Sequence, residues 1–352
     1  MSNVLAVFGG QWGSEGKGVV VNRIAHEYDI HVRVGGPNAG HSFNHEGRVW
    51  KMQSVPCGWT NPNADLVIGR GALVSLEQLS KELAEIAAVD PSIYQRVNVD
   101  QRAGVINPGW HNEGHTDGAI HHRIGSTGEG IGAARVARTN RDPNNFQHFG
   151  EVADSVGLGR IVHPDTAGLL NKAIESGQNV LMEGTQGAGL SLIHGPWPYV
   201  TSTDVSVAQM CADMGIPVSK VNERLMVVRT FPIRVAGNSG PMYGEMTWDQ
   251  MTERLGKPVV ERTTVTQKIR RVGQWDESLV ARSIMLNDPT SAAIMFLDYL
   301  NPADEGKLRV VDLSEASVNF LRYFRSTYPD VPVSLLGTGG ERWEVIDTGL
   351  PL

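Results

Sequence analysis

The chain has 352 residues, with 31 lysines and arginines against 38 aspartates and glutamates, a formal net charge of −7, and 41% hydrophobic residues, enough for a sizeable globular core. The acidic balance argues against a protein that coats nucleic acid, because phosphate binding favours a basic excess. The two cysteines, Cys57 and Cys211, lie far apart in sequence, which excludes a disulfide framework and favours a reducing compartment. The first residues show no basic leader and no apolar stretch of about 20 residues, so we expect a cytoplasmic location.

Strands and helices are expected to alternate along the chain. Residues 4–8 form a β-branched apolar strand, residues 9–18 a glycine-rich turn and residues 19–28 a helix. Further strands are expected at 31–34, 179–182, 291–297 and 331–336, and further helices at 76–89, 167–176, 276–286 and 315–328. This alternation predicts the α/β class, with a mostly parallel central sheet flanked by helices on both faces.

Two polar segments rich in Gly, Arg and Thr, residues 107–154 and 234–273, do not fit this alternation. Long irregular stretches inside a compact domain are usually functional loops, so we expect loop-rich insertions there. The sequence has no internal repeat, no low-complexity tract and no composition break that marks a domain boundary. We therefore expect a single domain over residues 1–352.

The glycine-rich turn at residues 9–18 has the composition of a P-loop-like nucleotide-binding loop. Between a strand and a helix, such a turn presents backbone N–H groups and a helix N-terminus to phosphate, and Lys17 adds a positive charge. The standard pattern has Gly and Ser or Thr where this chain has Gln11 and Gly18, so the loop is a relative of that motif and not a copy. The alternative is a tight strand-to-helix turn that binds no ligand.

Further polar blocks follow in the chain. His41 lies in an Asn-Ala-Gly-His-Ser block, and a pKa near neutrality suits proton donation, although a lone histidine is more often structural. Residues 126–132 and 183–187 are glycine loops with hydroxyl and amide groups, or else ordinary turns. Arg135, Arg138 and Arg141 are spaced either for a solvated face or for a phosphate clamp.

Together these blocks resemble the adenylosuccinate synthetase family. The matching segments occur in the family's order over nearly the whole chain, at residues 11–13, 38–42, 126–132, 183–187, 198–202, 263–266 and 270–273. The resemblance implies a homodimeric ligase that uses Mg²⁺ and transfers the γ-phosphate of GTP to the 6-oxygen of IMP. The amino group of L-aspartate then displaces that phosphate and leaves a 6-succinylamino purine.

Carried over position by position, the resemblance assigns roles to individual residues. His41 would be the general acid at the 6-oxygen, Ser14 and the Gly40 carbonyl would lie on Mg²⁺, and Arg138 would reach across the dimer to the partner's substrate phosphate. Arg270 and Arg271 can form bidentate pairs with the two carboxylates of aspartate. The donor nucleotide would bind at Gly13, Ser14, Glu15, Gly16, Lys17, Gly18, Gly40, His41, Ser42, Phe296, Asp298, Gly337 and Gly339, the purine monophosphate at Ser14, Asn38, Ser126, Thr127, Arg138, Gln186 and Thr201, and L-aspartate at Thr263, Thr264, Val265, Thr266, Lys268, Arg270 and Arg271.

Ser14 is the most informative departure from the family, which has at this position an aspartate that takes the N1 proton of IMP. A neutral serine cannot take that proton unaided. A purine with a 2-amino group needs room and a neutral hydrogen-bond partner beside N1, and serine supplies both. Such a serine resembles the viral 2-amino-2′-deoxyadenylosuccinate synthetases, which join dGMP to L-aspartate for diaminopurine nucleotide synthesis and would act in the host cytoplasm.

Phe296 is a second departure, because the family reads guanine with a lysine there. An aromatic ring favours stacking on adenine, so ATP or dATP is the expected donor, while the retained Asp298 leaves GTP open. Lys268 or a neighbour occupies the area of a family arginine near the ribose 2′-hydroxyl.

The alternatives to a dGMP ligase are an ordinary adenylosuccinate synthetase that uses IMP and GTP, and a nucleotide-gated binding protein without ligase chemistry. His41 and the arginines at 270 and 271 argue against the last, because a switch has no need to hold a dicarboxylic acid.

Overall fold

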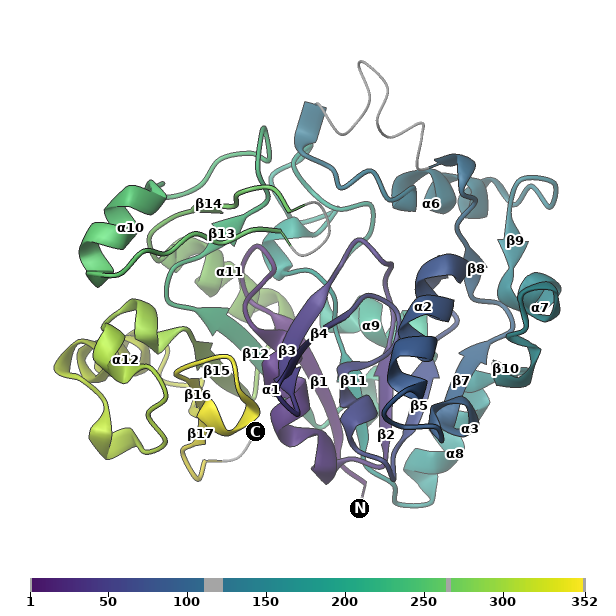
Figure 1. Ribbon diagram of the computed structural model, residues 1–352, viewed down its shortest axis with the longest axis horizontal. Helices are drawn as coiled ribbons and strands as arrows, with labels where there is room; N and C mark the ends of the chain where they lie inside the picture. Colours follow the sequence, from purple (N-terminus) through teal and green to yellow (C-terminus); the bar gives the residue numbers. More distant parts are fainter. Residues whose placement is uncertain (1, 111–122, 264–266, 351–352) are drawn as a thin grey trace.

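The computed structural model describes residues 2–110, 123–263 and 267–350. Within them, a ten-stranded sheet forms the centre of the molecule (Figure 1). In sheet order its strands are β10 (Val162–His163), β7 (Val97–Asp100), β5 (Asp65–Ile68), β2 (Ile30–Arg33), β11 (Val180–Glu183), β1 (Val4–Gly9), β12 (Glu223–Arg229), β15 (Ser291–Met295), β16 (Val333–Gly337) and β17 (Val345–Asp347). Neighbouring strands are parallel except β16 and β17, which confirms the predicted α/β class.

Helices cover both faces of the sheet (Figure 1). The two faces are set by alternation along β1, because successive strand residues point to opposite sides. Leu5 and Val7 join one core, and Val4, Ala6 and Phe8 join the other. The first core is covered by α1 (Lys17–Ile24), α2 (Leu76–Ala87) and α3 (Ile93–Arg96), and the second by α8 (Thr166–Glu175), α9 (Val207–Met214), α11 (Glu277–Asn287) and α12 (Glu315–Thr327).

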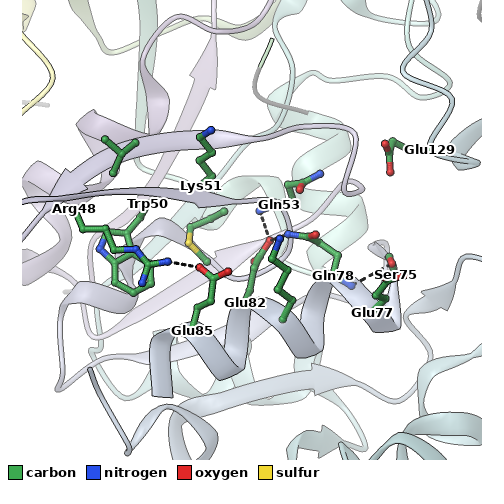
Figure 2. A pocket seen from close by; sticks show the side chains of 13 residues that line it. Arg48, Trp50, Lys51, Gln53, Ser75, Glu77, Gln78, Glu82, Glu85 and Glu129 are labelled. Atoms are coloured by element: carbon green, nitrogen blue, oxygen red, sulfur yellow. Dashed lines mark hydrogen bonds and ion pairs between the residues drawn. The ribbon is translucent and has the colours of Figure 1, made fainter. Parts of the chain in front are cut away.

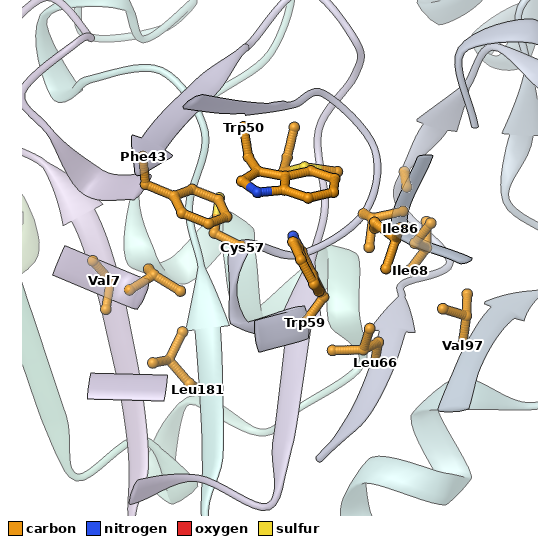
Figure 3. Packing of buried hydrophobic residues seen from close by; sticks show 14 of the residues in the cluster. Val7, Phe43, Trp50, Cys57, Trp59, Leu66, Ile68, Ile86, Val97 and Leu181 are labelled. Atoms are coloured by element: carbon orange, nitrogen blue, oxygen red, sulfur yellow. The ribbon is translucent and has the colours of Figure 1, made fainter. Parts of the chain in front are cut away.

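An antiparallel hairpin of β3 (His41–His45) and β4 (Arg48–Met52) packs over the first core. Trp50 meets Trp59 edge-on, with 4.6 Å between ring centroids, and Phe43 contacts the same indole (Figure 3). These rings bury the inner side of the hairpin against the sheet. Because His41 opens β3, the packing fixes its backbone relative to the sheet.

Smaller elements surround this centre. None of the described helices is long and apolar enough to cross a membrane. Cys57 and Cys211 are both free and buried. The further elements are a sheet of β6 (Leu73–Val74), β8 (Gly104–Val105) and β9 (Gln147–His148), a pair of β13 (Ile233–Arg234) and β14 (Arg271–Val272), and helices α6 (Ile131–Asn140), α7 (Phe149–Val152) and α10 (Trp248–Leu255).

The structure corrects two sequence-based expectations. The first helix begins earlier, at Lys17, because Gly16 turns the chain with a left-handed φ of 98°, and it ends at Ile24 before a 3₁₀ turn. The described parts of residues 107–154 and 234–273 are loop-rich, as expected, but not wholly irregular, because α6, α7 and α10 lie there. A capping box of Thr247 and Gln250 starts α10, and α6 buries apolar residues at helical spacing.

Candidate active site

The candidate site lies at the carboxyl ends of five adjacent strands. β2, β11, β1, β12 and β15 are consecutive in the sheet and parallel, so the segments that follow them meet at one edge. A cleft at this edge brings together many of the residues expected from the sequence. They are Gly13, Ser14, Lys17, Asn38, Gly40, His41, Thr127, Gln186, Thr263 and Arg270.

The charge of this cleft favours anions. Among the described residues that line it, the ionisable side chains are Lys17, His41 and Arg270, and none is a carboxylate. Lys17 is buried and donates to the Gln186 carbonyl at 2.6 Å and to Glu15 at 2.7 Å. A phosphate entering the cleft would meet this amine together with a helix N-terminus.

Glu15 organises the first loop from within and does not line the cleft. Its carboxylate is fully buried and accepts hydrogen bonds from the backbone N–H groups of Gln11 at 3.2 Å and Gly13 at 2.8 Å. A side chain at Gly187 would collide with it, since a Cβ there would lie 2.4 Å from Oε1. The carboxylate therefore fixes the loop's curvature, and its predicted contact with the donor nucleotide stays a prediction.

Ser14 is exposed at the cleft and has an unusual backbone. Its φ is 60°, in the left-handed region that non-glycine residues rarely adopt. Arg229 Nη1 donates to its carbonyl at 3.2 Å, and Arg270 Nη1 donates to its hydroxyl. The loop thus presents a neutral hydroxyl beside an arginine at the place where the sequence predicts contact with the purine.

His41 is held in a buried charge network with Glu183 and Arg33. His41 Nδ1 lies 2.5 Å from Glu183 Oε1, Arg33 Nη1 donates to the same oxygen at 3.0 Å, and the Cys57 N–H donates to the other oxygen at 2.7 Å. Burial alone would raise the pKa of Glu183, but Arg33, the His41 ring and the Cys57 amide hold it at about 2. Glu183 is therefore ionised, and it accepts the Nδ1 proton of His41.

The His41 ring is neutral at neutral pH. Burial and the Arg33 charge lower the pKa of His41 to about 4, against the opposing effect of Glu183. With its proton on Nδ1, the neutral ring has an unprotonated Nε2. Negative phosphate charge in the cleft would raise the pKa of the ring and favour protonation of Nε2, which is the form that a general acid needs.

Two buried histidines, His41 and His31, make the fold sensitive to acid. The pKa of His31 is also lowered to about 4 by burial, so in the window from about pH 6.5 to pH 4 the unfolded chain binds more protons than the folded one. Stability should fall as the pH falls through that window, by up to about 1.4 kcal/mol per pH unit for each histidine. Melting temperatures at pH 7, 6 and 5 measure this. The loss should be shallower in His41→Asn than in the parent, and an identical slope in the two proteins would contradict the assignment.

Comparison with known proteins agrees with this geometry. The model of the adenylosuccinate synthetase family matches residues 6–153 and 145–311. The adenylosuccinate synthetase of Methanococcus aeolicus is 36% identical over 97% of this chain and 98% of its own length, and that of Methanocaldococcus jannaschii is 37% identical over 97% and 95%. The chain belongs to the adenylosuccinate synthetase family. It is a ligase that forms a C–N bond with aspartate.

Solved structures of adenylosuccinate synthetase relatives share the whole fold. The succinoaminodeoxyadenylate synthetase of cyanophage S-2L, bound to dGMP and to dATP as an energy donor, superposes with a TM-score of 0.82 and is 26% identical in sequence. The superposition covers 99% of this chain and 96% of the phage enzyme. The fully ligated adenylosuccinate synthetase of Plasmodium falciparum has a TM-score of 0.85 at 21% identity, over 99% and 100%. The second likeness concerns the fold alone.

Some of the residues predicted to bind the purine monophosphate lie at the cleft. Asn38, Thr127 and Gln186 line the cleft. The Ser126 hydroxyl accepts from the Gly128 N–H at 3.3 Å, and the Thr201 N–H donates at 2.9 Å to Leu190, which lines the cleft. Arg138 instead donates to the carbonyls of Arg70 and Gly71 in its own chain, so its reach into a partner subunit stays a prediction.

The aspartate segment places its two arginines differently. Thr263 and Arg270 line the cleft, whereas Arg271 is paired with Glu245 through Nε and Nη2, both at 2.6 Å. The Lys268 N–H donates to the Thr263 hydroxyl at 3.0 Å. The predicted contacts at Thr264, Val265 and Thr266 lie outside the described residues. Of the arginine pair, Arg270 is thus the one placed at the cleft in this structure.

The predicted donor-base residues gather at the ends of β15 and β16, which are neighbours in the sheet. Phe296 and Asp298 follow β15, Gly337 ends β16 and Gly339 comes two residues later. Burial raises the pKa of Asp298 to about 6. A Cβ at Gly337 would lie 2.4 Å from the Met295 methyl, so glycine permits the close approach of the two strand ends. Gly18, at the end of the first loop, packs on the backbone of Ser42, another residue predicted to contact the donor nucleotide.

The predicted magnesium residues offer neutral oxygens. Gly40 and Ser14 both line the cleft, and a carboxylate is missing from its described lining. Mg²⁺ is usually bound through one or two carboxylates together with substrate phosphates and water, so an ion here would depend on phosphate oxygens, water and the Gly40 carbonyl. Nearby, ligand atoms of His41, Cys57 and Glu183 lie within 4.8 Å of one another, but Arg33 already occupies Glu183 and would repel a cation.

A second cleft lies between the β3–β4 hairpin and α2 (Figure 2). Charged side chains of both signs line it, including the Arg48–Glu85 pair. At its buried side, Glu82 accepts from the N–H groups of Gln53 at 2.6 Å and Val55 at 2.9 Å. Glu82 thereby fixes the segment that leads to Cys57, whose N–H holds Glu183.

Several organising residues were not assigned from the sequence. Glu183 lies in a recognised block, but its role beside His41 was not predicted, and Arg33, Arg229 and Glu261 were not considered. Three of these four share a signal, because Arg33, Glu183 and Arg229 each end a buried strand. A charge at the last position of an apolar strand in a parallel sheet indicates a side chain that serves the site at the carboxyl edge.

Proposed function

We propose that this synthetase joins L-aspartate to C6 of dGMP, with ATP or dATP as phosphate donor, and releases 2-amino-2′-deoxyadenylosuccinate, the nucleoside diphosphate and phosphate. The observation that carries the proposal is the neutral, exposed Ser14 hydroxyl at a cleft whose described lining has no carboxylate. The likeness to the phage enzyme bound to dGMP and dATP supports it.

Ser14 suits a purine with a 2-amino group. Its oxygen has two lone pairs, of which one accepts from Arg270 and the other is available to an amino donor. An aspartate at this position would be larger and would form a charged pair with Arg270. With IMP, which lacks the amino group, the second lone pair would gain no substrate donor, and sites built for such a bond discriminate against the analogue without it.

Different residues of the cleft have different roles in the proposed reaction. Lys17 and the loop amides hold the donor phosphates while the γ-phosphoryl group passes to O6 and the N1 proton passes to water. When bound, Mg²⁺ would be held by phosphate oxygens with the Gly40 carbonyl and would supply charge neutralisation. His41, protonated at Nε2 beside the phosphates and oriented by Glu183, donates a hydrogen bond to O6. Aspartate, held by Thr263 and Arg270, attacks C6 through its amino nitrogen, the C6–O6 bond breaks, and phosphate leaves with O6.

The donor assignment depends on Phe296. Its aromatic ring can stack on adenine, and Asp298 can accept the adenine amino group when it is ionised. The predicted homodimer, with Arg138 contacting the partner's substrate, is part of the same proposal.

A panel of dGMP, GMP, IMP and dIMP crossed with ATP, dATP and GTP, with L-aspartate present and phosphate release as the readout, tests the assignment. We expect the highest turnover with dGMP and an adenine donor. The second candidate, an ordinary adenylosuccinate synthetase acting on IMP with GTP, is favoured by the 36–37% identity to archaeal enzymes of that name. Highest turnover with IMP and GTP would establish it instead.

A further inference from the structure

One buried side chain contacts three parts of the site. Arg229, the last residue of β12, has no exposed surface. Its Nη1 donates to the Ser14 carbonyl and to Glu261 Oε2, both at 3.2 Å, and its Nη2 donates to Glu261 Oε1. Its guanidinium carbon lies 3.8 Å from the centre of the Phe296 ring. Arg229 thus joins the first loop, the predicted donor-base residue and the segment that leads to the aspartate loop.

Glu261 connects Arg229 to Arg270. The Glu261 carbonyl accepts from the Arg270 N–H at 2.9 Å, and its carboxylate also accepts from the Tyr299 hydroxyl at 2.9 Å. Although burial raises the pKa of Glu261, Arg229 and Arg270 lower it overall, so the group is a carboxylate at neutral pH. Arg270 in turn donates to the Ser14 hydroxyl. The position of Glu261 therefore helps to set the position of the arginine that faces the cleft.

Arg229 is held more firmly than its two neighbours, Phe296 and Glu261. The Arg229 backbone is fixed by Gln11, whose side-chain amide accepts from the Arg229 N–H at 2.9 Å and donates to its carbonyl at 3.0 Å. Phe296 is only half-buried, and Glu261 keeps 20% of its side-chain surface exposed. A ligand that holds Phe296 in place would therefore act through the Arg229 guanidinium, whose backbone is anchored, on Glu261, which is partly exposed.

We propose that Arg229 and Glu261 are positioning residues that couple occupancy of the donor-base site to the binding of L-aspartate. A base stacked on Phe296 holds the ring against the Arg229 guanidinium, which holds the Glu261 carboxylate and, through the Glu261 carbonyl, the Arg270 backbone. Aspartate then meets Arg270 already in position, which gives positive coupling between the two ligands. The inference rests on the proposed donor-base position at Phe296, but not on the identity of the purine monophosphate.

Phe296→Leu is the decisive variant, because a residue that only stacks on the donor base would affect the donor KM alone. We expect it to raise the aspartate KM by about 10-fold as well, measured with saturating donor. Glu261→Gln should raise the aspartate KM by a similar factor with little change in kcat. The double variant should resemble Glu261→Gln alone, because both changes break the same link. Asp312→Asn, which removes an exposed ion pair with Arg309, is the control and should change neither KM.

All variants are assayed with the purine monophosphate that the parent uses best, so a preference for IMP would overturn the proposed function without affecting this test. Melting temperatures verify that each variant is folded, and Arg229→Lys replaces Glu261→Gln if the latter does not fold. An unchanged aspartate KM in Phe296→Leu overturns the coupling, and so does a double variant whose KM is the product of the two single effects.

Discussion

Replacing His41 with asparagine is expected to lower kcat by about a thousandfold, because the hydrogen bond and proton at O6 are lost together. Asparagine can still donate to a carboxylate, so the buried Arg33–Glu183 pair keeps a polar neighbour and the fold should survive. The donor KM should change by less than about threefold, since the phosphates are held by Lys17 and the loop amides. Steady-state phosphate release at saturating substrates measures both constants.

His163→Asn is the matched control, since His163 lies on the edge strand β10 and does not line the cleft. It should retain parental activity. If His41→Asn keeps more than about a tenth of parental kcat, His41 does not contribute what general acid catalysis usually does, and its role at O6 is wrong.

Ser14→Asp is expected to lower kcat/KM for dGMP by about 100-fold while lowering that for IMP by less than about 10-fold. The carboxylate would fill the space beside the 2-amino group and would pair with Arg270, which the serine only hydrogen-bonds. The comparison between the two nucleotides cancels effects on donor and aspartate binding. Initial rates at low nucleotide concentration give both ratios directly.

Ser14→Ala separates size from hydrogen bonding. It keeps the space and the neutrality but removes the acceptor, so we expect a loss of about 10-fold for dGMP and little change for IMP. An equal loss on both nucleotides in Ser14→Asp would contradict the link between Ser14 and the 2-amino group.

The fold was predictable where local pattern and topology agree. The strand, glycine turn and helix at the start of the chain were identified from apolar run, glycine density and helix length, and the structure places β1 and α1 there. The β3–β4 hairpin was missed. Its outer residues are polar apart from Val49, and its inner aromatic rings pack on Trp59, a contact that no local pattern indicates.

The site was predictable to the extent that it follows strand ends. Blocks after β1, β2 and β11 meet because those strands are neighbours, and a parallel sheet brings the segments after its strands to one edge. The Arg33–Glu183 pair spans 150 residues and Arg229–Glu261 spans 32, so only the fold reveals them. Arg270 and Arg271 were treated alike, but successive residues of an extended segment point to opposite sides, and one meets Ser14 while the other meets Glu245.

A competition experiment tests the central claim most directly. The protein is given equimolar dGMP and IMP with L-aspartate, ATP and Mg²⁺, and mass spectrometry follows the ratio of the two succinylated products at low conversion, which equals the ratio of the kcat/KM values. We predict an excess of the 2-amino deoxy product of at least about 10-fold. A mixture dominated by the product from IMP would contradict the account.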